Sequence, residues 1–481
     1  MKTFLKQPWV YILLGISVVI VVLAVFLTPQ MKEPAPPEPE YTQKIREHMD
    51  HSQLITRKFK TGPEVTRACL ECHPNAAKDV MQTSHFQWVG KPVMVPGHDG
   101  NFRIGKRNLI NNFCIGIQGN WSSCTRCHAG YGWQDDTFDF KDESLVDCLV
   151  CHDGTGNYRK TGAGIPDPDV DLTAVAKSVG YPKRNNCGLC HNFGGGGMGV
   201  KHGDLDASLN NPMERDDVHM GKHNLLCIDC HRTENHNITG TSMSVSVTQE
   251  NGIFCTDCHS QMPHADERIN RHLDAVACES CHIPTYARRN PTKTYWDWSK
   301  AGDDSRPDDP HHYLKIKGEF VYETDVVPMY RWYNGTAERY LIGDTINPEE
   351  VTAINQPRGN INDANSKIHP FKIHYAIQPY DAGNNILTVP TTSGEGGYWH
   401  AFDWDKAMAL GAKATGQPYS GKLGFTRTEM YWPLSHMVVP GKDALQCTAC
   451  HGENGRMDWK ALGYPGDPAK VGARKIPGGA R

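Results

Sequence analysis

The segment CTRCHAGYGWQDDTFDFKDESLVDCLVCHDG, residues 124–154, carries the same five-residue pattern, C-x-x-C-H, near both of its ends. C-x-x-C-H is the attachment signature of c-type haem, in which two thiols bind the porphyrin and the histidine ligates the iron. Zinc knuckles and disulfide frameworks are the alternatives, but zinc sites need no histidine directly after each C-x-x-C unit. The pattern occurs eight times in the 481 residues, at Cys69–His73, Cys124–His128, Cys148–His152, Cys187–His191, Cys227–His231, Cys255–His259, Cys278–His282 and Cys447–His451. It therefore predicts eight covalently bound haem c groups, attached through Cys69, Cys72, Cys124, Cys127, Cys148, Cys151, Cys187, Cys190, Cys227, Cys230, Cys255, Cys258, Cys278, Cys281, Cys447 and Cys450.

The spacing of the motifs sets the expected fold class. Seven of them lie between Cys69 and His282, about one per thirty residues, which is too dense for separate small cytochrome domains. Eight porphyrins supply a large apolar core, in agreement with a hydrophobic content of only 38% and with 46 glycines and 31 prolines. We expect a mainly α fold with long ordered loops and few short strands, a multihaem cytochrome c built around eight packed haems.

Residues 66–481 are expected to form one octahaem body, with seven motifs in 69–282, a haem-free segment at 283–440 and the eighth motif at 447–451. In the haem-free segment, KGEFVYETDVVPMYRWYNG (317–335) is rich in β-branched and aromatic residues and predicts a hairpin. AFDWDKAMALGAKATG (401–416) predicts a helix that ends near its last glycine. The eighth motif must fold back onto the others, because an isolated haem cannot exchange electrons quickly.

The first thirty residues predict a membrane anchor. Trp9–Leu27 is a run of 19 residues without a charge, long enough to cross a bilayer as one helix. Lys2 and Lys6 precede it and favour a cytoplasmic N-terminus. A cleaved signal peptide is the alternative, although its apolar core is usually shorter, about 7–15 residues. Both interpretations export the rest of the chain, which starts with residues 31–65, a Pro/Glu-rich tether with a short helix at 42–55. The anchor, which we favour, would hold the body in the periplasm at the inner membrane.

Each haem iron has a second axial position, whose ligand decides between electron transfer and chemistry. Two histidines saturate the iron, whereas an exchangeable ligand leaves it open to small molecules. Eight of the 24 histidines are proximal ligands by their motif positions: His73, His128, His152, His191, His231, His259, His282 and His451. Sixteen remain, and any one of them can instead be a surface or hydrogen-bonded core residue. Seven lie near a motif or in loop-rich context and are predicted distal ligands, with His223 and His374 as reserves: His85, His202, His219, His236, His264, His272 and His436.

Cys114 is the one cysteine of the seventeen that belongs to no motif. A free cysteine is often a small buried hydrophobe. An unpaired thiol in an oxidising compartment is unusual, however, unless it is protected or used. Thiolate attack on a sulfur–sulfur bond is ordinary exchange chemistry, so Cys114 is a candidate to engage a polythionate.

Around this cysteine the chain resembles the octahaem tetrathionate reductase family, itself related to the hydroxylamine oxidoreductases and the pentahaem nitrite reductases. The resemblance rests on Cys114, on the second motif with its following AGYGW, and on VDCLVCHDGTG (146–156) with a lysine soon after. It also rests on DVHMG (217–221) and YRWYNGTAERYLIGD (330–344), and it covers most of the chain after the anchor.

The resemblance implies that the second haem, held by Cys124, Cys127 and His128, is the active one. It implies Lys160 as the distal ligand, which requires a neutral amine; the alternative is a solvated basic pair with Arg159. Asn111 would then hydrogen-bond a ligand near Cys114. Asp153 would tune Lys160, or simply cap a turn.

The function expected is a membrane-anchored periplasmic reductase of tetrathionate, nitrite or hydroxylamine, fed by a quinol-linked or periplasmic donor. A conduit with all eight irons saturated, and an oxidase of reduced nitrogen, stay open as alternatives; the latter would need a tyrosine crosslink that eighteen tyrosines do not exclude. The first motif has histidine where pentahaem nitrite reductases have lysine, which disfavours that enzyme. A net charge of −4 without a clustered basic surface predicts no nucleic-acid partner. A homo-oligomer is possible.

Overall fold

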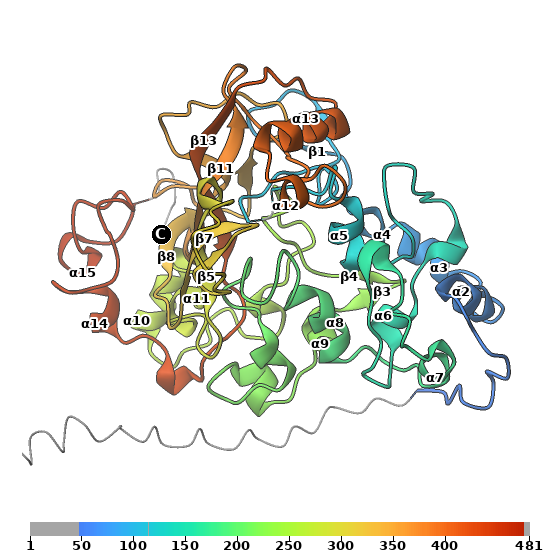
Figure 1. Ribbon diagram of the computed structural model, residues 1–481. Coiled ribbons are helices and arrows are strands. Elements are labelled where there is room, and N and C mark those ends of the chain that lie inside the picture. Colours follow the sequence, from blue (N-terminus) through green and yellow to red (C-terminus); the bar gives the residue numbers. More distant parts are fainter. Residues whose placement is uncertain (1–47, 114, 476–481) are drawn as a thin grey trace, which may run out of the picture. The chain divides into compact units, whose positions relative to one another are not determined.

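A computed structural model describes residues 48–113 and 115–475, which fall within one compact unit (Figure 1). Most of the haem motifs begin on a single turn of helix, for example at Cys227–Cys230 and Cys278–His282. One turn brings residues i and i+3 to the same side, so both thiols of a motif face the same way. In motifs of this kind the helix is only about as long as the motif itself.

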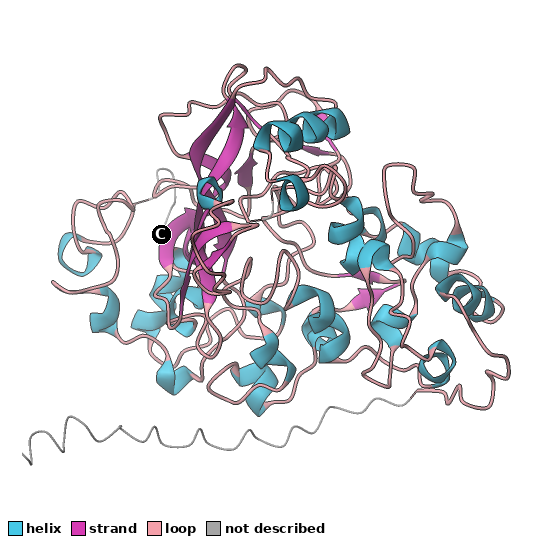
Figure 2. Ribbon diagram, in the orientation of Figure 1, coloured by secondary structure: helices cyan, strands magenta, loops and turns pink. Residues whose placement is uncertain are grey.

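Long loops connect many of the described α-helices (Figure 2). The longest of them, α13, has 12 residues, begins at its cap Asp403 and ends at Gly416, which confirms the helix predicted at 401–416. The helices are α2 (Gly62–Leu70), α3 (Ala76–Met81), α4 (Ser84–Gln87), α5 (Trp121–Cys124), α6 (Leu149–His152), α7 (Leu172–Lys177), α8 (Arg184–His191), α9 (Cys227–Cys230), α10 (Glu267–Asn270), α11 (Cys278–His282), α12 (Tyr398–Ala401), α13 (Trp404–Thr415), α14 (Cys447–Cys450) and α15 (Pro468–Val471).

The haem-free segment forms a nine-stranded mixed sheet, so the expectation of few short strands is wrong there. The predicted hairpin is also wrong: both of its strands form, but β7 pairs with β5 and β6, and β8 pairs with β11. The sheet order is β6-β7-β5-β11-β13-β10-β9, with β8 and β12 also on β11. Its strands are β5 (Thr292–Asp297), β6 (Tyr313–Leu314), β7 (Gly318–Glu323), β8 (Met329–Tyr333), β9 (Ala337–Arg339), β10 (Thr352–Pro357), β11 (Lys367–Asp381), β12 (Ile386–Leu387) and β13 (Leu423–Pro433); β1 (Val93–Met94) with β2 (Asn101–Phe102) and β3 (Thr233–Glu234) with β4 (Asn237–Ile238) form two separate ribbons.

The sheet positions the chain that enters the second motif. Trp296 of β5 and Trp432 of β13 belong to the same buried cluster as Ile110 and Ile115, which precede that motif. Closer to the motif, Asn120 accepts hydrogen bonds from the backbone N–H of Thr392 (2.7 Å) and Ser393 (3.2 Å). The haem-free segment is therefore a scaffold for the second motif.

The predicted anchor at 1–30 lies outside the described residues, as does the tether as far as residue 47. In the part of the chain that is described, no helix is long and apolar enough to span a bilayer. Of the short helix expected at 42–55, residues 48–55 contain a turn and no helix.

Candidate active site

Six motif histidines each face a second imidazole. An iron bound by two imidazoles, with bonds of about 2 Å, holds the ring centres about 6 Å apart. The observed ring-centre distances match this spacing, so the side chains present fit haem. The pairs are His51–His73 (6.4 Å), His85–His191 (6.2 Å), His231–His436 (6.3 Å), His219–His259 (6.0 Å), His264–His282 (6.0 Å) and His272–His451 (6.1 Å).

Hydrogen bonds at Nδ1 orient several of these rings. His231 donates from Nδ1 to the carbonyl of Thr239 (2.8 Å), and His272 to that of Arg268 (2.9 Å). In the third motif His152 donates to the carbonyl of Gly180 (2.9 Å). Such bonds leave Nε2 as the nitrogen that can ligate a metal, the usual arrangement for histidine ligands.

Five of the seven predicted distal histidines thus lie opposite a motif histidine: His85, His219, His264, His272 and His436. His51 was missed, because it precedes its motif by 22 residues, in the stretch interpreted as a short helix at 42–55. His236 lies close enough to His152 to lower the pKa of that ring, as do His48 and His73. The ring of His202 lies 5.0 Å from that of Trp432, and no ring contact with a motif histidine is found for it in residues 48–113 and 115–475.

Contacts between cysteines of different motifs give the order in which the motifs are neighbours. Cys69 contacts Cys148, Cys187 contacts Cys227, and Cys255 contacts Cys278. Weaker electrostatic contacts link Cys151 with Cys187, Cys230 with Cys258, and Cys281 with Cys450. The first, third, fourth, fifth, sixth, seventh and eighth motifs therefore follow one another, from α2 to α14 in Figure 1. The eighth motif folds back as predicted.

The second motif branches from this line, because Cys127 contacts Cys190 of the fourth motif. One short helix serves both motifs. His85 of α4 faces His191 of the fourth motif, and the carbonyl of the next residue, Phe86, accepts a hydrogen bond from Nε2 of His128 (2.6 Å).

His128 differs from the other motif histidines in its surroundings. Among the described residues, the rings that contact its imidazole belong to phenylalanine and tryptophan, including Trp133 at 4.7 Å and Phe86 at 5.0 Å. Its carbonyl contact is made by Nε2, the reverse of His152 and His231. Burial lowers its pKa to about 3, with help from Lys160 and Lys106 and against the bond to Phe86, so the ring is neutral.

Three lysines lie near the second motif. The positive charges of Lys106, Lys160 and Lys201 all help to lower the pKa of the Cys127 thiol. The ammonium of Lys106 lies 3.9 Å above the ring of Trp88, which itself contacts His128. Such a concentration of positive charge favours anions.

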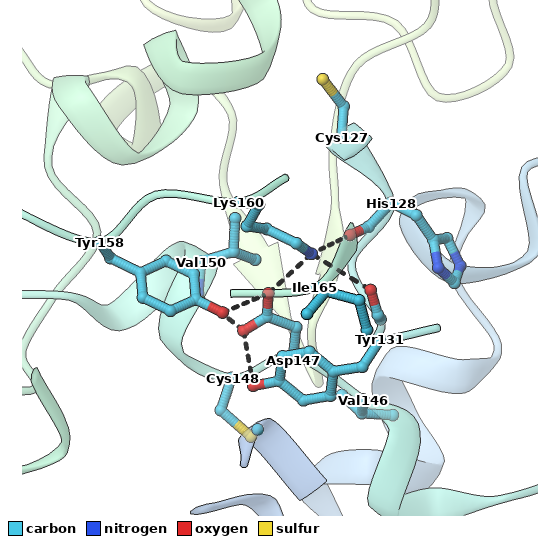
Figure 3. Close-up of polar contacts among 12 residues, drawn as sticks. Cys127, His128, Tyr131, Val146, Asp147, Cys148, Val150, Tyr158, Lys160 and Ile165 are labelled. Carbon is cyan, nitrogen blue, oxygen red and sulfur yellow. Dashed lines mark hydrogen bonds and ion pairs between the residues drawn. The ribbon is translucent and has the colours of Figure 1, made fainter. Parts of the chain in front are cut away.

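Lys160 is buried in a polar cluster (Figure 3). Its amine lies 2.7 Å from a carboxylate oxygen of Asp147 and donates to the carbonyls of His128 (2.5 Å) and Gly130 (3.2 Å). Asp147 also accepts from the hydroxyls of Tyr131 and Tyr158, each at 2.9 Å. Burial, reinforced by Asp147, raises the pKa of both tyrosines well above the ordinary value, so they remain donors.

Asp147 is the partner that sequence reasoning missed, although it directly precedes Cys148. Asp153 caps a turn instead: it accepts from the backbone N–H of Thr155 (2.8 Å) and of Tyr158 (3.1 Å). Among the described residues it forms no hydrogen bond or ion pair with Lys160. In this arrangement Lys160 is paired as an ammonium. Iron ligation would require this amine to give up a proton, because only a neutral amine has a lone pair that can bind iron.

Cys114 lies outside the described residues, but its neighbours are described. Asn111 accepts through Oδ1 from the backbone N–H of Phe113 (3.1 Å) and Ile115 (3.0 Å). Its own N–H donates to the carbonyl of Ile115 (2.7 Å). Asn111 thus ties Phe113 and Ile115 to its own side chain and backbone.

Comparisons with known proteins agree with the haem geometry. A family model described as Cytochrome c bacterial matches residues 293–454. The crystal structure of an octahaem cytochrome c from Shewanella oneidensis is 47% identical, with a TM-score of 0.83, covering 88% of this chain and 98% of that one. An uncharacterized protein from Archaeoglobus fulgidus is 26% identical over 267 residues, which cover 45% of this chain and 88% of that protein.

Proposed function

The chain belongs to the octahaem c-type cytochromes, and from that premise we propose that it is a reductase whose reaction takes place at the second motif. Its substrates would be small oxidised sulfur or nitrogen species: tetrathionate, nitrite or hydroxylamine. The observation that carries the proposal is the contrast between six motif histidines paired with imidazoles and His128, which is surrounded by aromatic rings and lysines.

The paired histidines support a relay role for their motifs. Bound haem supplies the electrons and, where its sixth ligand is exchangeable, a coordination position for a small molecule. The second motif contacts the line of motifs through the fourth and lies at the end of this branch. Such a position suits the haem to which electrons are finally delivered. Lys106 and Lys201 attract an anion there, and Asp147 holds the amine of Lys160 close to the carbonyl of His128.

We also propose that the body works in the periplasm, anchored by residues 1–30, with electrons from a quinol-linked or periplasmic donor. The anchor and the donor are proposals from the sequence. Cys114 is proposed to engage the sulfur–sulfur bond of tetrathionate; its neighbours Phe113 and Ile115 both donate hydrogen bonds to the side chain of Asn111.

The test is turnover of the purified holoprotein with reduced viologen and each acceptor, together with visible and electron paramagnetic resonance spectra. Lys160→Ala is expected to change the signal of one haem out of eight, and Lys141→Ala, an exposed lysine on the same loop system, to change none. An unchanged spectrum in Lys160→Ala would show that Lys160 is not a ligand. Only low-spin bis-histidine signals, with no response to nitrite or hydroxylamine, would make the protein a conduit.

Cys114→Ala tests the thiol separately. We expect tetrathionate turnover to fall while hydroxylamine turnover is retained, because only tetrathionate offers a sulfur–sulfur bond. Tetrathionate turnover at the full rate would remove Cys114 from the reaction.

A further inference from the structure

Asn112 and His374 form a buried pair that joins the segment before the second motif to the middle of β11. The amide nitrogen of Asn112 donates to the backbone carbonyl of His374 (2.7 Å), and its Oδ1 lies 3.1 Å from Nδ1 of the His374 ring. Both side chains are fully buried. His374 is opposite Met430 in the longest ladder of the sheet, so the pair is held rigidly.

The amide of Asn112 decides which ring nitrogen of His374 carries the hydrogen. Because Nδ2 is the donor to the carbonyl, Oδ1 must face the ring, and an amide oxygen only accepts. Nδ1 of His374 therefore carries the hydrogen. Burial holds the pKa of His374 well below its ordinary value, and Lys372 and Lys293 act in the same direction. The ring is neutral, and its Nε2 presents a lone pair.

This Nε2 is buried and has no hydrogen-bond partner in the described portion of the chain. Buried polar atoms are almost always paired, and an exception calls for a ligand or another functional reason. An unprotonated nitrogen in this state accepts a hydrogen bond and donates none.

His374 and the second motif share a neighbouring segment. Lys372 lies two residues from His374 on the same face of β11 and donates to the carbonyls of Val200 (3.1 Å) and Lys201 (2.9 Å). Lys201 in turn lies close enough to Cys127 to lower the pKa of its thiol. From the other side, Asn112 precedes the second motif by twelve residues of the same connected segment.

We propose that His374, oriented by Asn112, is a specificity-determining residue whose Nε2 accepts a hydrogen bond from a substrate that carries an O–H or N–H group. Hydroxylamine has such groups. Nitrite and tetrathionate carry only acceptor oxygens, so they cannot donate a hydrogen bond to the lone pair of Nε2. This rests on the proposed reductase function and narrows its substrate class. In hydroxylamine reduction two electrons and two protons break the N–O bond and give ammonia and water.

The experiment compares the wild-type holoprotein with His374→Leu, which removes the acceptor, and His374→Gln, which keeps one in its amide oxygen. His98→Leu is the control, since His98 is hydrogen-bonded to Asp344 at 2.9 Å and has no part in the site. KM and kcat are measured for hydroxylamine, nitrite and tetrathionate with reduced viologen. The dissociation constant of hydroxylamine for the oxidised holoprotein is measured from visible difference spectra.

For His374→Leu we expect KM and the dissociation constant of hydroxylamine to rise about tenfold, the factor that corresponds to the loss of one hydrogen bond. The values for nitrite and tetrathionate should change less than about twofold. His374→Gln should stay near the wild type. If His374→Leu does not fold, Asn112→Ala is the second variant: it frees the ring to change tautomer, so hydroxylamine binding should weaken about threefold.

An equal rise in KM for all three acceptors in His374→Leu would show that His374 has only a structural role, and would overturn the proposal. A changed signal of one haem in His374→Leu would make it an iron ligand, with the same consequence. A wild-type protein that binds hydroxylamine but reduces none of the acceptors would refute the proposed function, while the dissociation constants would still decide the role of His374.

Discussion

Asp147 is the residue on which the cluster around Lys160 depends. Its carboxylate accepts from two tyrosine hydroxyls and from an ammonium, while both charged side chains are at most 1% exposed. Removing one partner of a buried ion pair leaves the other charge without compensation, at a cost of about 3–5 kcal/mol. We expect Asp147→Asn to lower the free energy of unfolding of the holoprotein by this amount, measured by guanidinium denaturation.

Asp135→Asn is the matched control for that substitution. Asp135 is an exposed carboxylate that caps a turn of the same loop, at Thr137. The control should cost far less than Asp147→Asn. Equal losses would mean that the Lys160–Asp147 pair contributes no more than a surface carboxylate does.

At the residue scale, the sequence predicts which residues attach the haems, but not which side chains lie opposite one another in the fold. C-x-x-C-H is local, so all its members are found by spacing alone. The carboxylate beside Lys160 is decided by the tertiary fold, which is why Asp153 was a reasonable candidate and Asp147 the actual neighbour. His51 was missed for the same reason, since nothing near it in the chain indicates that it faces His73.

Among the elements, helix α13 supports the second motif through a close backbone contact. A Cβ at Gly411 would overlap the carbonyl oxygen of Val389, and the neighbouring Pro390 carbonyl accepts from Asn120 (3.0 Å). Glycine to alanine inside a helix normally stabilises it by about 1 kcal/mol. Here we expect Gly411→Ala to destabilise the protein by about 2 kcal/mol, from overpacking, in denaturant melts.

Ala414→Gly, at an exposed position of the same helix, provides the reference for ordinary helix propensity. It should cost about 1 kcal/mol. A stabilised Gly411→Ala would show that α13 can move away from Val389 without loss.

The end of β11 gives a prediction with a pH dependence. Asp381 accepts from the backbone N–H of Gly383 (3.0 Å) and Ser420 (2.8 Å) and from Asn384 (2.7 Å). Burial alone would raise its pKa, but these bonds and that of the Ser420 hydroxyl outweigh it and leave the pKa below the ordinary value. A lowered pKa gives stability that is present above the ordinary value and is lost as the pH falls through the folded one.

Asp381→Asn should therefore lower the free energy of unfolding by about 2 kcal/mol at pH 7. The difference from the wild type should shrink below about pH 4, where the carboxylate becomes protonated. Urea melts at pH 7 and pH 3 measure both values. A difference that is independent of pH would show that charge plays no part in these bonds.

The sheet itself was beyond sequence reasoning. β11 is buried along most of its length on both faces and includes Lys372 and His374, so it lacks the alternation that marks a half-exposed strand. Strands β7 and β8 were recognised by composition, yet their partners lie far away in sequence. The helix at α13 was predictable because its cap and its terminal glycine are local signals.

At the scale of the whole molecule, motif count and density predict one body, and the described residues fall within one compact unit, but the sequence does not predict the order in which the motifs contact one another. That order depends on cysteine contacts such as Cys127 with Cys190, which place the fourth motif at a junction. If electrons follow these contacts among the described residues, the second motif exchanges them with the other six motifs through the fourth. His85 is the imidazole that faces His191 there.

His85→Met should therefore isolate the second motif, because a methionine ligand raises the reduction potential of a haem and makes the junction retain its electron. The fully reduced holoprotein is mixed with hydroxylamine, and haem reoxidation is followed by stopped-flow absorbance. In His85→Met we expect a fast phase confined to the second motif and a phase about tenfold slower or more for the haems beyond the fourth. His272→Met changes the eighth motif, at the far end of the line, and should leave all but one haem on the fast phase. If His85→Met reoxidises uniformly, electrons reach the acceptor by a route that bypasses the fourth motif, and the branched order of the motifs is wrong as a description of electron flow.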